Sequence, residues 1–126
     1  MKIDAKTPPR SFPVKGAGLE DVLHDCAHIQ LEANEQVTFV TPSGAEYDVV
    51  RKSWGYYATP STNGRLKSFN FRTALVRAST GRFFVMLAES EKIDDFLAYL
   101  AADKQALVCW LDDEKDLTRL TAAFLE

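Results

Sequence analysis

Acidic residues are missing from the middle of this chain. No Asp or Glu occurs in the forty residues from 49 to 88, which carry seven Lys and Arg side chains. The other residues hold eight basic and eighteen acidic side chains, so a chain of formal net charge −3 joins a cationic middle to anionic ends. The positive charge of such a segment can attract an anionic ligand. It can equally pair with the acidic residues at the two ends of the same chain. We predict that at least two of its five arginines form ion pairs with carboxylates of the acidic ends.

Cysteine and long apolar runs are also scarce. The two cysteines are too few for a disulfide framework, which predicts buried, reduced thiols. Apolar runs such as Phe83–Ala88 fall far short of the ~20 residues that span a bilayer, and no secretory signal follows Met1. The sequence pI of about 5.4 argues against a general nucleic-acid binder. We therefore expect a soluble cytoplasmic protein whose partners include neither membrane nor nucleic acid.

Both histidines lie in one short segment, His24-Asp25-Cys26-Ala27-His28. On a strand the two histidines and Cys26 would share a face, and on a helix the histidines would be neighbours. No Cys-x-x-Cys or His-Glu-x-x-His spacing accompanies them, so we predict neither a metal site nor a cofactor.

Turn residues divide the first two thirds of the chain. The prolines and glycines of residues 1–18 predict an irregular arm, and the apolar spacing of residues 19–26 predicts a short helix. Pro42-Ser43-Gly44 and Ser79-Thr80-Gly81 each separate two runs rich in β-branched and aromatic residues. These patterns predict two hairpins, one over residues 36–52 and one over residues 69–88.

The apolar period changes after residue 89. Ile93, Phe96, Leu97 and Leu100 predict a helix that Ser90 caps, and residues 106–111 predict a strand. Asp113 is positioned to cap a last helix. The chain is therefore predicted to be one α+β domain over residues 1–126. Its mainly antiparallel sheet would have five or six strands, with the C-terminal helices packed on one face.

The segment around residues 54–67 is the strongest candidate for a site. Its aromatic rings offer stacking surfaces, its short polar side chains offer hydrogen bonds, and its basic side chains suit a phosphate or carboxylate. The candidate ligand-binding residues are Trp54, Tyr56, Tyr57, Asn63, Arg65, Lys67 and Arg72. The alternative is a structured turn whose aromatics fill a core and whose basic side chains pair with carboxylates.

Residues Trp54–Lys67, Glu35–Thr41 and Val108–Asp112 resemble a pattern of small uncharacterised bacterial proteins. The resemblance extends from about residue 26 to about residue 113. It implies a bacterial protein that is encoded among genes for surface polysaccharides or sugar nucleotides. It implies no activity and no catalytic residues.

Three functions fit these features. We expect first a small binding or accessory protein, not an enzyme, whose cationic-aromatic segment holds an anionic small molecule or a protein partner. The first alternative is an enzyme acting on sugars or nucleotides, with His24 or His28 as its acid or base. The second is a structural subunit of a homo-oligomer. Trp110 lies in an apolar strand and is expected in the core, whereas Trp54 is expected at a boundary or a site.

Overall fold

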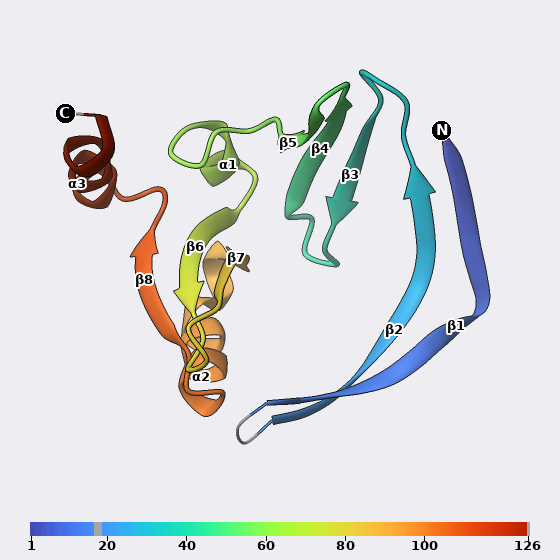
Figure 1. Ribbon diagram of the computed structural model, residues 1–126, viewed down its shortest axis with the longest axis horizontal. Helices are drawn as coiled ribbons and strands as arrows, with labels where there is room; N and C mark the ends of the chain where they lie inside the picture. The colour runs from blue at the N-terminus through green and yellow to red at the C-terminus, as the bar shows by residue number, and fades with distance from the viewer. Residues whose placement is uncertain (17–18, 126) are drawn as a thin grey trace.

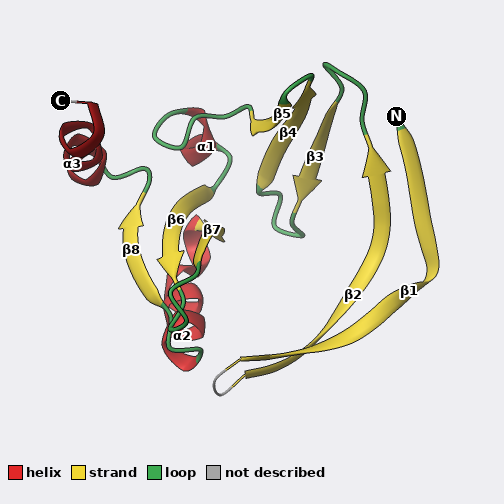
Figure 2. Cartoon of the chain, in the orientation of Figure 1, coloured by secondary structure: helices red, strands yellow, loops and turns green. Residues whose placement is uncertain are grey.

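The structure is a computed structural model that describes residues 1–16 and 19–125. It is an α+β fold of three small antiparallel sheets and a few helices (Figures 1 and 2). In chain order the elements are β1 (Lys2–Gly16), β2 (Leu19–Gln30), β3 (Gln36–Val40), β4 (Glu46–Lys52), β5 (Gly55–Ala58), α1 (Arg65–Ser68), β6 (Phe71–Arg77), β7 (Phe83–Glu89), the 3₁₀ turn η1 (Ser90–Lys92), α2 (Ile93–Ala102), β8 (Ala106–Trp110) and α3 (Glu114–Leu125).

The first sheet is a long two-stranded ribbon, in which β1 pairs with β2. Figure 1 shows it curving past the other sheets as a separate arm. Strand β1 takes the place of the irregular arm expected over residues 1–18, of which residues 17 and 18 lie outside the described part. Proline excludes helix, but its fixed φ suits edge strands, and both strands of a ribbon are edges. The helix expected over residues 19–26 is wrong, because this segment pairs along its length with β1.

Both predicted hairpins are confirmed. Strands β3 and β4 flank the turn at Gly44, and strands β6 and β7 flank the turn at Gly81. Gly44 has a φ of +91° and Gly81 a φ of +86°, a backbone region that favours glycine. A third tight turn, Ser53–Trp54, brings β5 back along β4.

The prediction of one sheet with five or six strands is wrong. The strand orders are β3-β4-β5 and β7-β6-β8, and within the described residues neither set pairs with the other or with the ribbon. The loop after β5 and helix α1 redirect the chain before β6 begins. Alternating side chains indicate which segments are strands, but the choice of neighbouring edge depends on contacts between distant parts of the chain.

Only one of the two C-terminal helices packs closely on a sheet. Leu100 of α2 is buried with Ala74 and Val76 of β6. Helix α3 has no buried side chain among residues 114–125, so the predicted packing holds for α2 and not for α3. A second core cluster of Ala45, Leu66 and Phe71 joins the sheet of β4 to that of β6.

The helix starts follow the capping prediction at one site and depart from it at the other. Asp113 caps α3, since its Oδ1 accepts hydrogen bonds from the backbone N–H groups of Lys115 (2.9 Å) and Asp116 (3.1 Å). Ser90 does not cap α2, because it belongs to the turn η1 that precedes this helix. No helix in the described ranges is long and apolar enough to cross a membrane.

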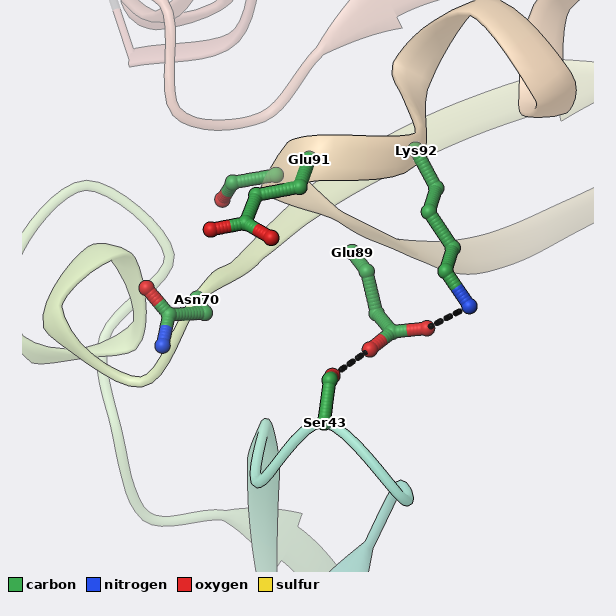
Figure 3. Close-up of a pocket in the computed structure, with 6 residues that line it drawn as sticks. Ser43, Asn70, Glu89, Glu91 and Lys92 are labelled. Carbon is green, nitrogen blue, oxygen red and sulfur yellow. Dashed lines mark hydrogen bonds and ion pairs between the residues drawn. The ribbon is translucent and has the colours of Figure 1, made fainter.

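Glu89 connects the two three-stranded sheets. It lies at the end of β7, and its carboxylate accepts hydrogen bonds from Ser43 and, at 2.8 Å, from Thr41 beside the β3–β4 turn. Lys92 Nζ lies 3.4 Å from its other oxygen, as Figure 3 shows. The two hydroxyl donors, Ser43 first, hold the pKa of Glu89 below its ordinary value.

We predict that Glu89→Gln lowers the melting temperature at neutral pH but not in strong acid. The lowered pKa means that the ionised carboxylate stabilises the fold above about pH 4.5, and that this stabilisation is lost as the pH falls through the lowered pKa. Thermal unfolding between about pH 7 and about pH 3 should show the two melting curves converging.

The matched control is Glu91→Gln. Glu91 is an acid that lines the same surface hollow as Glu89. Within residues 1–16 and 19–125 the Glu91 side chain makes no hydrogen bond or ion pair, so its replacement should leave the pH profile of stability unchanged. Parallel profiles for wild type and Glu89→Gln at every pH would contradict the connecting role of Glu89.

Candidate functional site

The aromatic half of the candidate segment lies on the surface of the β4–β5 hairpin. Trp54 occupies the tip of the tight turn and is 71% exposed. Its ring stacks on that of Tyr57, with centroids 6.0 Å apart and planes 24° from parallel. Tyr57 is 43% exposed and Tyr56 is 54% exposed. Trp54 and Tyr57 therefore support each other on one face of the hairpin, and Tyr56 points to the other face.

Strand β5 is also the open edge of its sheet. In an antiparallel pair, residues alternate between those that bond to the neighbouring strand and those whose N–H and C=O groups point away. Thr59 donates to Asp48 O at 3.1 Å, which fixes this alternation, so the backbone groups of Tyr56 and Ala58 point outward. The Arg51 guanidinium lies over the Tyr56 ring, 5.7 Å from its centroid. We call Arg51, Trp54, Tyr56, Tyr57 and the outer side of β5 the aromatic edge.

The polar loop that follows is tied to the end of β8 and the start of α3. Thr62 Oγ1 donates to Leu111 O at 2.6 Å, and Asn63 Nδ2 donates to Glu114 Oε1 at 3.3 Å. Arg65 donates to Thr59 Oγ1 at 3.0 Å, and its guanidinium lies 5.4 Å from the centroid of the Phe69 ring. Two of the predicted ligand contacts, Asn63 and Arg65, therefore have structural partners already.

Arg72 is held most firmly of the candidate residues. It donates two hydrogen bonds to Asp112, of 3.0 and 2.9 Å, and Asp112 is only 1% exposed. Its guanidinium lies 3.8 Å from the centroid of the Trp110 ring, whose other neighbour is Phe96. The hydrogen bonds that Arg72 donates to Asp112 raise the pKa of Arg72 above its already high ordinary value, so the side chain stays charged.

A hollow of about 410 Å³ opens beside this pair. Lys67 and Arg72 line it together with Ser90 and three carboxylates, those of Asp112, Asp113 and Glu114. The acids outnumber the bases, and Asp112 already neutralises Arg72. Trp54, Tyr56 and Tyr57 do not line this hollow. The structure therefore separates the exposed aromatic residues from the basic ones, which sequence proximity places in one site.

The charge pattern predicts at least two ion pairs from the five central arginines. The described part of the chain contains one, between Arg72 and Asp112. The carboxylates at the chain ends therefore serve other contacts, such as the cap by Asp113 and the hydroxyl bonds of Glu89. Arg51 Nη1 is buried without a hydrogen-bond partner in the described region.

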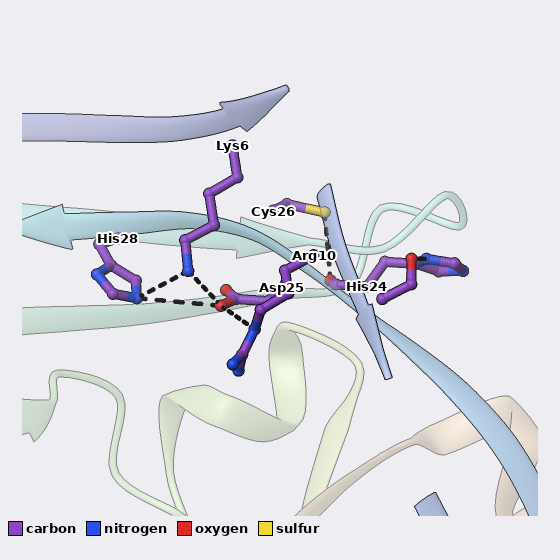
Figure 4. Close-up of polar contacts among 7 residues, drawn as sticks. Lys6, Arg10, His24, Asp25, Cys26 and His28 are labelled. Carbon is purple, nitrogen blue, oxygen red and sulfur yellow. Dashed lines mark hydrogen bonds and ion pairs between the residues drawn. The ribbon is translucent and has the colours of Figure 1, made fainter. Parts of the chain in front are cut away.

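Both histidines lie on the ribbon, remote from this segment. His24 shares a 2.7 Å hydrogen bond with Ser11, and His28 lies 3.3 Å from Lys6. Lys6 also donates a hydrogen bond of 2.6 Å to Asp25, and this contact is drawn in Figure 4. The bond lowers the pKa of Asp25. In Figure 1 strands β3 and β4 lie between β2 and helix α1.

The thiols differ from the prediction. Cys26 is exposed on the ribbon and Cys109 is half-buried, so the expectation of a buried thiol is wrong for Cys26. It fails because residue 26 lies on a ribbon strand that, in the described part of the chain, pairs only with β1. Burial raises the pKa of the Cys109 thiol.

Sequence reasoning missed two residues of functional interest. Arg51 faces Tyr56 only because the turn at Ser53–Trp54 sets that register. A Gly two residues after Ser53 is a signal that could have located this turn. The burial of Asp112 had no distinctive sequence signal, because Asp113 and Glu114 follow it in the same acidic run and are less buried.

The chain has no match among protein-family models, curated proteins or solved structures. Within residues 1–16 and 19–125 no three His, Cys, Asp or Glu side chains gather as they would around a metal ion.

We predict that Arg72→Met destabilises the fold by about 3–5 kcal/mol, because it leaves the buried Asp112 carboxylate without its partner. Chemical denaturation measures this change. The control is Arg77→Met on the same strand. Arg77 is exposed and should matter by about 0.5 kcal/mol or less. Equal losses in the two variants would contradict a structural role for the Arg72–Asp112 pair.

Proposed function

We propose that this chain is a non-enzymatic binding protein whose aromatic edge docks a protein partner. The observation that carries the proposal is the stacked, exposed pair of Trp54 and Tyr57. Trp, Tyr and Arg are the side chains that most often dominate protein interfaces, because they cover a large area at little cost in conformational entropy. All three types occur in the aromatic edge.

The partner that suits this surface is an extended, acidic segment. The outward backbone groups of Tyr56 and Ala58 can accept an added strand, and the rings beside them supply apolar contact. Arg51 and Lys52 on the neighbouring strand provide positive charge, and neither forms an ion pair in the described part of the chain. Because β5 spans only four residues, the added strand would be short and most of the affinity would come from the side chains.

An anionic small molecule would find less favourable contacts on this protein. The hollow that holds Lys67 and Arg72 carries three carboxylates, which repel an anion. The rings that would pack against a sugar or a base lie outside that hollow. The enzyme alternative lacks support for a similar reason, because both histidines lie on the ribbon. The context implied by the sequence resemblance, a bacterial protein encoded among polysaccharide genes, is compatible with an accessory role.

We predict that Trp110→Ala loses much more stability than Trp54→Ala. Trp54 is mostly exposed, so its loss should change the free energy of unfolding by about 0.5 kcal/mol or less. Trp110 packs against Phe96 and Arg72, so its loss should cost about 3 kcal/mol, the lower end for a large aromatic. Urea denaturation of both variants measures the difference. Similar losses would mean that Trp54 is a structural residue.

The functional test places a photo-crosslinking amino acid at the exposed position 53, which keeps Trp54 in place, and identifies the chain captured in the native host by mass spectrometry. Calorimetry then measures its affinity for purified wild type, Trp54→Ala and Tyr57→Ala. We expect each variant to weaken binding by about 30-fold, as for a hot spot of about 2 kcal/mol. Phe124→Ala is the control, because Phe124 is an equally exposed aromatic on α3.

Two outcomes would overturn the proposal. The first is equal affinity for Trp54→Ala and Phe124→Ala. The second is a rise in melting temperature with phosphate, a nucleoside diphosphate or a uronic acid that Arg65→Ala with Lys67→Ala abolishes. The second result would transfer the function to the basic residues and a small anion.

A further inference from the structure

The β1–β2 ribbon has one apolar face and one polar face. Residues that pair across an antiparallel ribbon share a face, and the faces alternate along each strand. The register places the following apolar residues on one face: Ile3, Ala5, Phe12, Val14, Leu23, Ala27 and Ile29. The opposite face carries mainly polar residues, namely Lys2, Asp4, Ser11, His24, His28 and Gln30. Ile3, Val14, Leu23 and Ile29 are exposed, whereas Phe12, which lies under the Arg10 guanidinium, is half-buried.

Such a ribbon does not hold its shape alone in water. Two strands without a third strand or a covering layer are marginally stable at best. In the described part of the chain, β1 and β2 pair only with each other, and no buried cluster includes a residue of either strand. Within the described residues the apolar face therefore has no cover.

The surface area of the whole chain shows that area for an interface is available. A compact monomer of 14.1 kDa exposes about 6,700 Å² by the usual scaling of surface with mass. This chain exposes 8903 Å², which is an excess of about 2,200 Å² on that scaling. A standard protein interface removes only about 800 Å² from each partner. One chain thus offers ample area for a stable dimer.

We propose that the cover is the ribbon of a second copy of this chain. Two ribbons related by a twofold axis would pack their apolar faces against each other as a small four-stranded sandwich, with the sheets about 10 Å apart. In such an arrangement each copy supplies the same apolar surface that it needs. The ribbon of each copy then covers the apolar face of the other.

The charges of the ribbon favour this occupant. Residues 1–30 contain four basic and four acidic side chains, so two copies meet without net repulsion, and a strongly charged foreign partner gains no attraction. The charged pair at the centre of the apolar face is already neutralised, since Arg10 Nε lies 3.7 Å from Asp25 and Lys6 binds the same carboxylate. Burial therefore leaves this central pair neutral, while Asp21, opposite Val14, lies nearer the turn end of the same face.

The test compares two neighbouring substitutions on β2. Leu23 lies on the apolar face and Val22 on the other, and the two side chains are 48% and 57% exposed. Sedimentation equilibrium should give about 28 kDa for wild type, twice the 14.1 kDa of one chain. Val22→Glu should keep that mass. Leu23→Glu should fall to the mass of one chain, or dimerise at least about 100-fold more weakly, because each interface would then bury two like charges.

Hydrogen exchange on the wild type gives a second readout that needs no variant. Amide protection in β1 and β2 should fall on dilution through the dissociation range, whereas protection in β6 should not. A wild-type monomer at about 100 μM, well above the range of a stable dimer, would overturn the proposal and leave the face to another protein. Equal masses for Val22→Glu and Leu23→Glu, or ribbon protection that is independent of concentration, would overturn it as well. Trp54→Ala should leave the mass unchanged, so this proposal and the proposed function can fail separately.

Discussion

The pairing of Arg72 with Asp112 organises the C-terminal half of the molecule. Asp112 follows β8 directly, and Arg72 lies near the start of the central strand β6, so their two hydrogen bonds fix one end of the sheet. The neighbours of Asp112 use that position in turn. Leu111 accepts the bond from Thr62 that anchors the polar loop, and Asp113 caps α3. A buried carboxylate without a partner would be costly, so these contacts depend on the guanidinium that Trp110 and Asp112 hold in place.

The same pairing explains why the cationic middle does not act as one site. Arg72 is neutralised by Asp112, and Arg65 is bound to Thr59 within its own loop. The aromatic residues before that loop lie on another sheet, whose open edge is β5. A segment that is continuous in sequence is thus divided into a structural basic part and an exposed aromatic part. The exposed part carries the aromatic side chains that are common in protein interfaces. The basic part makes hydrogen bonds and an ion pair that hold neighbouring elements together.

Two surfaces remain uncovered, and they differ in kind. The aromatic edge is small and rests on a packed sheet, so it is stable whether or not a partner is bound. The ribbon has no sheet behind it, so its cover is a condition of its folding. The ribbon therefore suits a permanent contact between identical chains, whereas the aromatic edge suits a contact that forms and dissolves. A dimer built on the ribbons would carry two aromatic edges and bind a partner with two such segments more tightly.

Local patterns determined most of the secondary structure. Gly44 and Gly81 located the two hairpins, the apolar spacing from Ile93 to Leu100 located α2, and Asp113 located the start of α3. These signals concern neighbours within a few residues, which is why the sequence alone could reveal them. The exposure of Trp54 fits its predicted place at a boundary. Trp110, predicted in the core, packs against the core cluster of β6 and α2 but is only half-buried.

Only the tertiary structure decided which edges pair and which charges meet. Nothing in the strand patterns showed that β5 and β6 belong to different sheets, that residues 19–26 pair with β1, or that Asp112 and not another acid would be buried. Each depends on residues up to forty positions apart, as in the contact from Arg72 to Asp112. Which strands and charges pair is decided by how distant segments pack, and the alternative packings differ little in energy. A local sequence pattern does not contain this information.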